Sequence, residues 1–229
     1  MGESKKSTSA PKSAPPRFRV AVMLSGRGSN FEALLNTCHQ EQSCKEEWPI
    51  DFAVVMADNS TARGLQIAVA AGVPTRVVPR EPKELTNAQY NAVLAAEMAP
   101  FQPDLIVLAG FMRILTTEFI SRFRGKIINI HPSLLPSFKG LNAQQQALKA
   151  GVKFSGCTVH VALEELDSGP IIAQAVVPVM PDDTEESLSE RILKEEHRLL
   201  PAVVNSIARG SIRVVVHSDQ TVSVEDGGR

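Results

Sequence analysis

"FRVAVMLSGRGSNFEALLNTCHQ", residues 18–40, runs from an apolar segment through a glycine-containing loop into a helical pattern. The apolar segment, residues 18–24, is rich in β-forming side chains and predicts a buried strand. This strand–loop–helix order recurs further along the chain. More strands are expected at residues 50–58, 75–79, 103–110 and 126–132, and helices at residues 59–72, 85–101 and 116–123.

Strands rich in Val, Ile and Leu that alternate with helices indicate βαβ units and a parallel sheet covered on both faces. The sequence therefore predicts an α/β fold with a Rossmann-like, doubly wound, mostly parallel sheet, and ligands beyond the C-terminal ends of its strands. Residues 154–179 hold two strand-like runs around an acidic Gly-Pro turn, which predicts a C-terminal antiparallel addition. A long helix is expected to start at Asp183, with Glu186 in its cap, before a small hairpin at residues 211–217 and 221–226.

Composition limits the possible functions. The chain has 229 residues, so we expect one domain, residues 18–229, with a substantial core. A net charge of −1 and only 5% aromatic residues give no charged surface or stacking platform for nucleic acid. No apolar run approaches the roughly 20 residues that a membrane helix needs. We therefore expect small-molecule partners, and neither nucleic acid nor a membrane.

Residues 1–17 are rich in Ser, Pro and Lys and lack the apolar core of a secretory signal. We expect a disordered tail there, with an organelle transit peptide as the alternative. Three scattered cysteines fit a reducing compartment, so a cytoplasmic location is expected. His131, His160 and His197 lie in different expected elements without a ligand spacing, which argues against a metal site.

The loop SGRGSN, residues 25–30, joins a strand to a helix, where exposed N–H groups and the helix dipole favour an anion. Gly26 and Gly28 fit the start of a dinucleotide fingerprint, but Phe31 occupies the position of its third glycine. Asp58 follows the second strand, where an acid that binds ribose could lie. A plain tight turn is one interpretation, and a phosphate monoester site is the other.

The segment LAGFMRIL, residues 108–115, passes from a buried strand into an apolar loop. Its simplest interpretation is core followed by a turn. Its functional interpretation is a wall for a flat heterocycle, whose ring edge would bind backbone groups.

Asn129 and His131 lie two residues apart at the end of an expected strand, so their side chains share a face. Asp167, in the turn ELDSGP, could face His131. They could be hydrogen-bonded structural residues, or an acyl-transfer site in which the amide stabilises an oxyanion and the acid orients the imidazole. No G-x-S-x-G elbow is present, so a covalent acyl-enzyme is not indicated.

Several segments together resemble the phosphoribosylglycinamide formyltransferase family. They are MLSGRGSN (23–30), PDLIVLAGFMRIL (103–115), INIHPSLLPSFKG (128–140), GCTVHVALEELDSGPIIAQ (156–174) and KEEHRLLP (194–201). The resemblance implies the formyltransferase fold and direct formyl transfer from the co-substrate 10-formyltetrahydrofolate to glycinamide ribonucleotide. That reaction belongs to purine (IMP) biosynthesis and uses no metal.

The resemblance also implies site residues. The catalytic set would be Asn129, His131 and Asp167. The ribonucleotide would be bound by Gly28, Ser29, Asn30 and Glu196. The folate would be bound by Met112, Arg113, Ile114, Leu115, Asn129, Leu163, Glu164, Glu165, Leu166 and Asp167. One family arginine linked to the folate site appears here as Asn87.

Three rival functions remain open. Formyltetrahydrofolate deformylase shares the Asn-x-His…Asp set but usually carries an N-terminal regulatory domain. Methionyl-tRNA formyltransferase usually adds a C-terminal domain and a basic surface. A non-enzymatic nucleotide-binding module would need only the phosphate loop. We expect a stand-alone enzyme, either a monomer or a homodimer.

Overall fold

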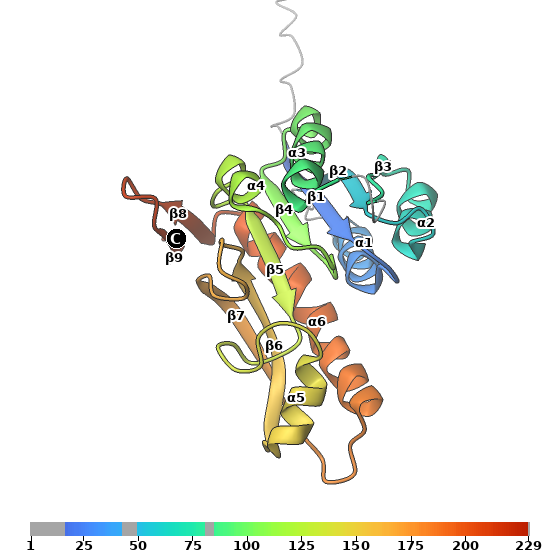
Figure 1. The fold of residues 1–229 in the computed structure, drawn as a ribbon, viewed down its shortest axis with the longest axis vertical. Coiled ribbons are helices and arrows are strands. Elements are labelled where there is room, and N and C mark those ends of the chain that lie inside the picture. Colours follow the sequence, from blue (N-terminus) through green and yellow to red (C-terminus); the bar gives the residue numbers. More distant parts are fainter. Residues whose placement is uncertain (1–16, 43–49, 81–84, 229) are drawn as a thin grey trace, which may run out of the picture.

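A computed structural model of the chain describes residues 17–42, 50–80 and 85–228 (Figure 1). All of the tail expected at residues 1–17, except Arg17, lies outside these described ranges. No helix of the described ranges is both long and apolar enough to cross a membrane.

A seven-stranded sheet forms the centre of the molecule, in the order β3-β2-β1-β4-β5-β6-β7. The first five strands in this order are parallel, whereas β6 pairs antiparallel with β5, and β7 antiparallel with β6. The predicted parallel sheet and its antiparallel addition are therefore confirmed. The strands are β1 (Phe18–Leu24), β2 (Ile50–Ala57), β3 (Thr75–Val77), β4 (Leu105–Leu108), β5 (Ile127–His131), β6 (Phe154–Val161) and β7 (Ile171–Pro178).

Helices cover both faces of this sheet, which gives three layers (Figure 1). They are α1 (Ser29–Gln42), α2 (Arg63–Ala70), α3 (Asn87–Met98), α4 (Thr117–Arg122), α5 (Ala143–Ala150) and α6 (Glu185–Ala208), with a 3-10 turn at Ala99–Phe101. A separate two-stranded hairpin, β8 (Ile212–Val216) and β9 (Val222–Asp226), follows α6 and confirms the predicted C-terminal hairpin. It packs beside the end of α4, where Val216 meets Gly125.

Alternation along each strand divides the core in two. In β1, Val22 faces the cluster formed with α1, α2, α5 and α6, and Met23 faces the cluster formed with α3 and α4. Both faces of the sheet are buried, which explains why these strands are almost uninterrupted apolar runs. In β1 and β2 the polar residues, Arg19 and Asp51, occupy only the second position of the strand.

Several elements differ from the sequence predictions. The helix expected from residue 59 begins at Arg63, because the Asn59 side chain accepts hydrogen bonds from Thr61 in a turn. The long helix is capped by Thr184, whose side chain accepts a hydrogen bond from the Ser187 N–H, and not by Asp183. No helix was expected at α5, whose AQQQALKA sequence is mostly polar.

Gly156 lies in β6, opposite Val176 of β7. A Cβ atom there would lie 1.9 Å from the carbonyl oxygen of Ala175 and 2.8 Å from Leu134. The first clash is with backbone, which cannot rotate away. Position 156 therefore has no room for a side chain.

We predict that Gly156→Ala lowers the free energy of unfolding by about 3 kcal/mol, at the upper end of the usual cost of overpacking. Urea unfolding followed by circular dichroism measures this change. Gly26→Ala is the matched control, because its added methyl group meets no atom within 4 Å. Equal unfolding midpoints for the two variants would contradict the steric requirement at Gly156.

Candidate active site

The loops that follow β1 and β4 are joined at the C-terminal edge of the sheet. The Ser25 N–H donates to the Gly110 carbonyl over 3.1 Å, and the Met112 N–H donates to the Ser25 hydroxyl over 2.9 Å. Because β1 and β4 are neighbouring parallel strands, their loops meet at this edge. The predicted phosphate loop and the predicted folate loop are therefore side by side.

Within the phosphate loop, Gly28 has a φ of 74° and packs against α2. A Cβ atom at Gly28 would lie 2.4 Å from the Cα of Gly64. Both the backbone conformation and the packing thus require glycine. Ser29 then begins α1, so the turn directs the free N–H groups of a helix N-terminus toward the edge of the sheet.

Asn30 and Glu196 form a buried polar pair beneath this loop. The Asn30 Nδ2 group donates to Glu196 Oε2 over 2.8 Å, although α1 and α6 are far apart in the sequence. Burial raises the pKa of Glu196, against the opposing effects of the Asn30 hydrogen bond and the charge of Arg27. Asn30 Oδ1 is also buried and has no hydrogen-bond partner within the described part of the chain. The unpartnered Asn30 Oδ1 atom and the Glu196 carboxylate can both accept hydrogen bonds from a polar ligand.

The end of β5 brings the predicted catalytic residues together. His131 Nδ1 lies 3.4 Å from Asp167 Oδ2. The other Asp167 oxygen, Oδ1, lies 3.7 Å from His160 Nε2, and that nitrogen is 3.1 Å from Asn129 Nδ2. One carboxylate thus connects two imidazoles, and one of these contacts the amide.

Asp167 is held in place by several contacts. Its backbone has a φ of 49°, in the left-handed region that few side chains adopt, and its Oδ2 accepts the Gly140 N–H over 2.8 Å. Burial would raise the pKa of Asp167. The contact with His160, the hydrogen bond from Gly140 and the charges of His131 and His160 together keep this pKa below its ordinary value. The group is therefore a carboxylate at neutral pH, with its position fixed from several sides.

Both ring nitrogens of His131 face acceptors. Nδ1 points to the Asp167 carboxylate, and Nε2 lies 2.9 Å from the Phe138 carbonyl. Such surroundings suit a ring that donates from both nitrogens, as an imidazolium does. This is the form that can stabilise negative charge on a substrate.

His160 is a site residue that the sequence analysis considered only as a metal ligand. It lies directly opposite Asn129 in the antiparallel pairing of β5 with β6. Its Nδ1 lies 3.0 Å from the Val161 carbonyl, and its Nε2 lies 3.1 Å from the Asn129 amide nitrogen. The contact with Nε2 occupies one N–H of Asn129 and leaves the other for a substrate. The pairing register could have revealed His160, but the sequence alone does not supply it.

Thr158, two residues before His160, fixes the loop that follows β5. Its hydroxyl donates to the Ser133 carbonyl over 2.7 Å and accepts the Leu135 N–H over 3.1 Å. Gln174 on β7 donates to the Leu135 carbonyl and to the same hydroxyl. The antiparallel addition therefore supports the loop that carries Phe138 and Gly140 to the predicted catalytic residues.

The predicted folate segments are partly exposed. The side chains of Met112 and Ile114 are open to solvent, whereas Leu115 is buried in the core, so its side chain supports the loop and does not line a surface. Arg113 forms an ion pair with the buried carboxylate of Asp58. Asp58 thus anchors this loop from β2, a role that the sequence analysis did not predict.

Ion pairs connect the second predicted folate segment, residues 163–167, to neighbouring residues. Glu164 pairs with Arg124, and Arg124 also donates to the Gln220 carbonyl of the C-terminal hairpin over 3.4 Å. Glu165 pairs with Lys139 over 3.4 Å. Leu166 is exposed beside Gly140, near the catalytic carboxylate.

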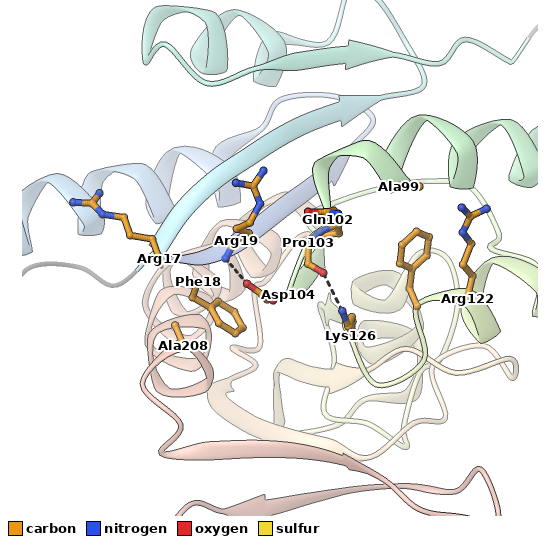
Figure 2. Close-up of a pocket in the computed structure, with 11 residues that line it drawn as sticks. Arg17, Phe18, Arg19, Ala99, Gln102, Pro103, Asp104, Arg122, Lys126 and Ala208 are labelled. Carbon is orange, nitrogen blue, oxygen red and sulfur yellow. Dashed lines mark hydrogen bonds between the residues drawn. The ribbon is translucent and has the colours of Figure 1, made fainter. Parts of the chain in front are cut away.

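A separate hollow of about 780 Å³ lies at the other edge of the sheet, where β1, β4 and β5 begin (Figure 2). Figure 2 shows Arg19, Asp104 and Lys126 around it, with Arg19 N–H donating to Asp104 and Lys126 to the Pro103 carbonyl. None of the predicted site residues lines this hollow. The predicted site residues lie instead at the C-terminal edge of the sheet, where open α/β sheets bind their ligands.

Among the residues with described positions, no three His, Cys, Asp or Glu side chains gather as metal ligands would. The arrangement can instead supply an amide N–H, two imidazoles and a carboxylate. These groups suit an acyl transfer in which an oxyanion forms and a proton moves.

Comparison with known proteins agrees with this chemistry. A sequence profile described as formyl transferase matches residues 18–204. The chain is 38% identical over 196 residues to the phosphoribosylglycinamide formyltransferase of Haemophilus influenzae, a match that covers 86% of this chain and 90% of that protein. The crystal structure of glycinamide ribonucleotide transformylase 1 from Symbiobacterium toebii has a TM-score of 0.81 and 39% identity, and the match covers 96% of this chain and 100% of that one.

A longer relative is also similar. The chain is 43% identical over 198 residues to the trifunctional purine biosynthetic protein adenosine-3 of Gallus gallus. The match covers 86% of this chain and 19% of that protein. It thus spans about a fifth of that relative's length. With the profile match and the bacterial relatives together, the chain belongs to the formyl transferase family, among the phosphoribosylglycinamide formyltransferases.

Proposed function

We propose that the chain transfers the formyl group of 10-formyltetrahydrofolate to the amine of glycinamide ribonucleotide. The products are formylglycinamide ribonucleotide and tetrahydrofolate, and the reaction belongs to de novo purine synthesis. The observation that carries the proposal is the Asp167 carboxylate between His131 and His160, with the Asn129 amide alongside. The names of the bacterial relatives support the choice of substrates.

In this proposal the amine nitrogen attacks the formyl carbon and the carbonyl oxygen becomes an oxyanion. The free N–H of Asn129 donates to that oxygen, and the positive charge of a protonated His131 stabilises it. Asp167 keeps His131 oriented and charged, and takes up the proton of the attacking amine directly or through water. The intermediate then releases the folate nitrogen, which takes up the proton held by Asp167, directly or through water, as it leaves.

The remaining roles follow the placement of each residue. The phosphate of the ribonucleotide would bind the N–H groups of Gly28, Ser29 and Asn30, and Glu196 would accept from its glycinamide or ribose end. The pterin would lie between the Met112–Leu115 loop and residues 163–167, in contact with Asn129 and Asp167. A cytoplasmic location, a monomeric or dimeric state and a single domain over residues 18–229 stay predictions.

The alternative is formyltetrahydrofolate deformylase, in which water replaces the amine. A spectrophotometric assay of folate product, with and without glycinamide ribonucleotide, separates the two. Transformylase activity requires the ribonucleotide, and deformylase activity does not. Absence of product in both reactions, from a folded protein, would contradict both enzymatic proposals and favour a binding module.

We expect Asp167→Asn to reduce kcat by about a hundredfold or more, the usual effect of removing a general acid–base group. The amide can still accept the Gly140 N–H, so the fold should persist, as a thermal melt can verify. Asp182→Asn, on an exposed turn, is the matched control. Turnover near the wild-type value in Asp167→Asn would remove this residue from the mechanism.

We expect Glu196→Gln to raise the KM for the ribonucleotide about tenfold, since a charge-assisted hydrogen bond is worth roughly 1.5–3 kcal/mol. The KM for the folate should not change. Glu195→Gln is the control, because Glu195 lies on the same helix but pairs with the exposed Arg198. An equal rise in both KM values would instead indicate a general disturbance of the site.

The same substitution should also affect stability. Because burial raises the pKa of Glu196 above its ordinary 4.5, the folded state binds this proton more tightly than the unfolded chain between pH 4.5 and the raised value. The charged form is therefore unfavourable in the fold at neutral pH. We expect Glu196→Gln to be more stable than the wild type at pH 7, and the difference to shrink as the pH falls toward 4.5. Urea unfolding at several pH values tests this, and a pH-independent difference would contradict it.

A further inference from the structure

The hollow of Figure 2 is separate from the predicted site and has the size of a small-molecule site. It lies where β1, β4 and β5 begin, and its volume is about 780 Å³. Ligand pockets in proteins usually measure roughly 300–1,000 Å³. None of the predicted catalytic, ribonucleotide or folate residues lines the hollow, so the proposed reaction gives it no role.

The lining of the hollow is basic. Among its described residues are four cationic side chains and one acid, namely Arg17, Arg19, Arg122, Lys126 and Asp104. The Asp104 carboxylate already accepts the Arg19 N–H over 2.8 Å, and Arg19 Nη1 lies 3.5 Å from Asp51 Oδ2. Arg122 and Lys126, by contrast, form no ion pair within the described part of the chain. The lining therefore keeps positive charge that favours an anion.

A tight turn carries the two unpaired cations. Arg122 is the last residue of α4, and Lys126 directly precedes β5. The Lys126 N–H donates to the Phe123 carbonyl over 2.9 Å, and the Lys126 carbonyl accepts the Ile106 N–H over 2.7 Å. The first contact closes the turn and the second joins it to β4. The backbone that carries both cations is therefore fixed to the sheet.

Cations at this edge also have a simpler role, because helices end here and leave carbonyl groups without donors. Arg19 Nε donates to the Phe101 carbonyl over 2.9 Å, and Lys126 Nζ donates to the Pro103 carbonyl over 3.3 Å. Each contact uses a single N–H of a group that carries several. The Arg122 guanidinium makes no hydrogen bond to any residue of the described ranges. Binding of carbonyl groups thus leaves donors for a ligand.

The composition of the lining indicates which anion fits. Arginine binds phosphate through two parallel hydrogen bonds, and lysine binds it as a compact point charge. The cations belong to β1, to the end of α4 and to the residue before β5, so they approach the hollow from separate elements (Figure 2). Apolar side chains, among them Phe18, Phe123 and Ala208, complete the lining. This combination suits a small molecule with several phosphate groups.

We propose that the hollow binds a small molecule that carries several phosphate groups, with Arg122 and Lys126 as its main contacts. The inference goes beyond the proposed reaction, because the hollow lies at the edge of the sheet opposite the predicted catalytic residues. It does not depend on that reaction either, since binding can be measured without turnover.

Isothermal titration calorimetry with inorganic triphosphate tests the proposal. The double variant Arg122→Gln with Lys126→Gln removes both cations. We expect the Kd to rise about tenfold for each cation removed, the usual effect of losing a charge-assisted hydrogen bond. Lys149→Gln with Lys153→Gln is the matched control, because these exposed lysines carry the same charge but lie outside the hollow. The control variant should bind triphosphate like the wild type.

Two further variants keep the test independent of folding defects. Arg122→Lys with Lys126→Arg retains both charges and should retain the binding. Arg122→Gln alone changes an exposed side chain without a hydrogen bond to a described residue, so the fold should persist, as a thermal melt can verify. We expect this single variant to bind triphosphate about tenfold more weakly than the wild type.

Absence of triphosphate binding to the wild type would overturn the proposal outright. Equal weakening in the Lys149→Gln, Lys153→Gln control would indicate general attraction between charges. Unchanged binding in the Arg122→Gln, Lys126→Gln variant would place the anion elsewhere, for example at the loop of residues 25–30. Citrate carries carboxylates in place of phosphates and should bind more weakly, so equal affinity for citrate would contradict phosphate recognition.

ATP, titrated in the same way, shows which part of the ligand the hollow contacts. Tighter binding of ATP than of triphosphate, lost in the Arg122→Gln, Lys126→Gln variant, would support a nucleotide whose nucleoside contacts apolar side chains such as Phe18. Equal binding of the two probes, lost in the same variant, would support recognition of the phosphate groups alone. Binding of ATP that this variant retains would contradict the site.

Discussion

The carboxylate of Asp167 is the group on which the arrangement of the site depends. It lies between His131 of β5 and His160 of β6, and it accepts the N–H of Gly140 from the loop that connects these strands. These contacts require a left-handed backbone at Asp167 itself. They also require β6 to run antiparallel to β5, since only that register places His160 opposite Asn129. The change from parallel to antiparallel strands is thus a condition for the chemistry.

Most of the fold could be predicted because its strands are buried on both faces. Residues such as Val22 and Ile106 belong to runs without polar interruption, which distinguishes parallel from antiparallel architecture. The elements that the sequence analysis missed or placed wrongly depend on weaker or more local signals. Thr184 and Asp183 are both good caps, but Asp183 accepts hydrogen bonds from Arg191 of the same helix, and Thr184 caps it. Helix α5 is short and rich in glutamine, so its periodicity is weak, and tertiary packing stabilises it.

The placement of the candidate site residues could be predicted where residues close in the sequence define it. Asn129 and His131 share a face because strand geometry requires this, and the phosphate loop follows from a strand–glycine–helix order. The contact of Asn30 with Glu196 and the place of His160 depend on elements far apart in the sequence. Local sequence patterns do not reveal contacts between residues that are so far apart in the sequence. The resemblance to a known family supplied Glu196, but neither approach indicated the anchoring of Arg113 by Asp58.

The position of Arg124 has a consequence for the dynamics of the catalytic loop. This one side chain binds both Glu164, in the segment that leads to Asp167, and the Gln220 carbonyl at the tip of the C-terminal hairpin. Local opening of that segment must therefore break the ion pair of Glu164 with Arg124, whose other partner is the hairpin. Fluctuations of the hairpin can thus reach this segment through Arg124, which limits how rigidly the chain holds the Asp167 carboxylate.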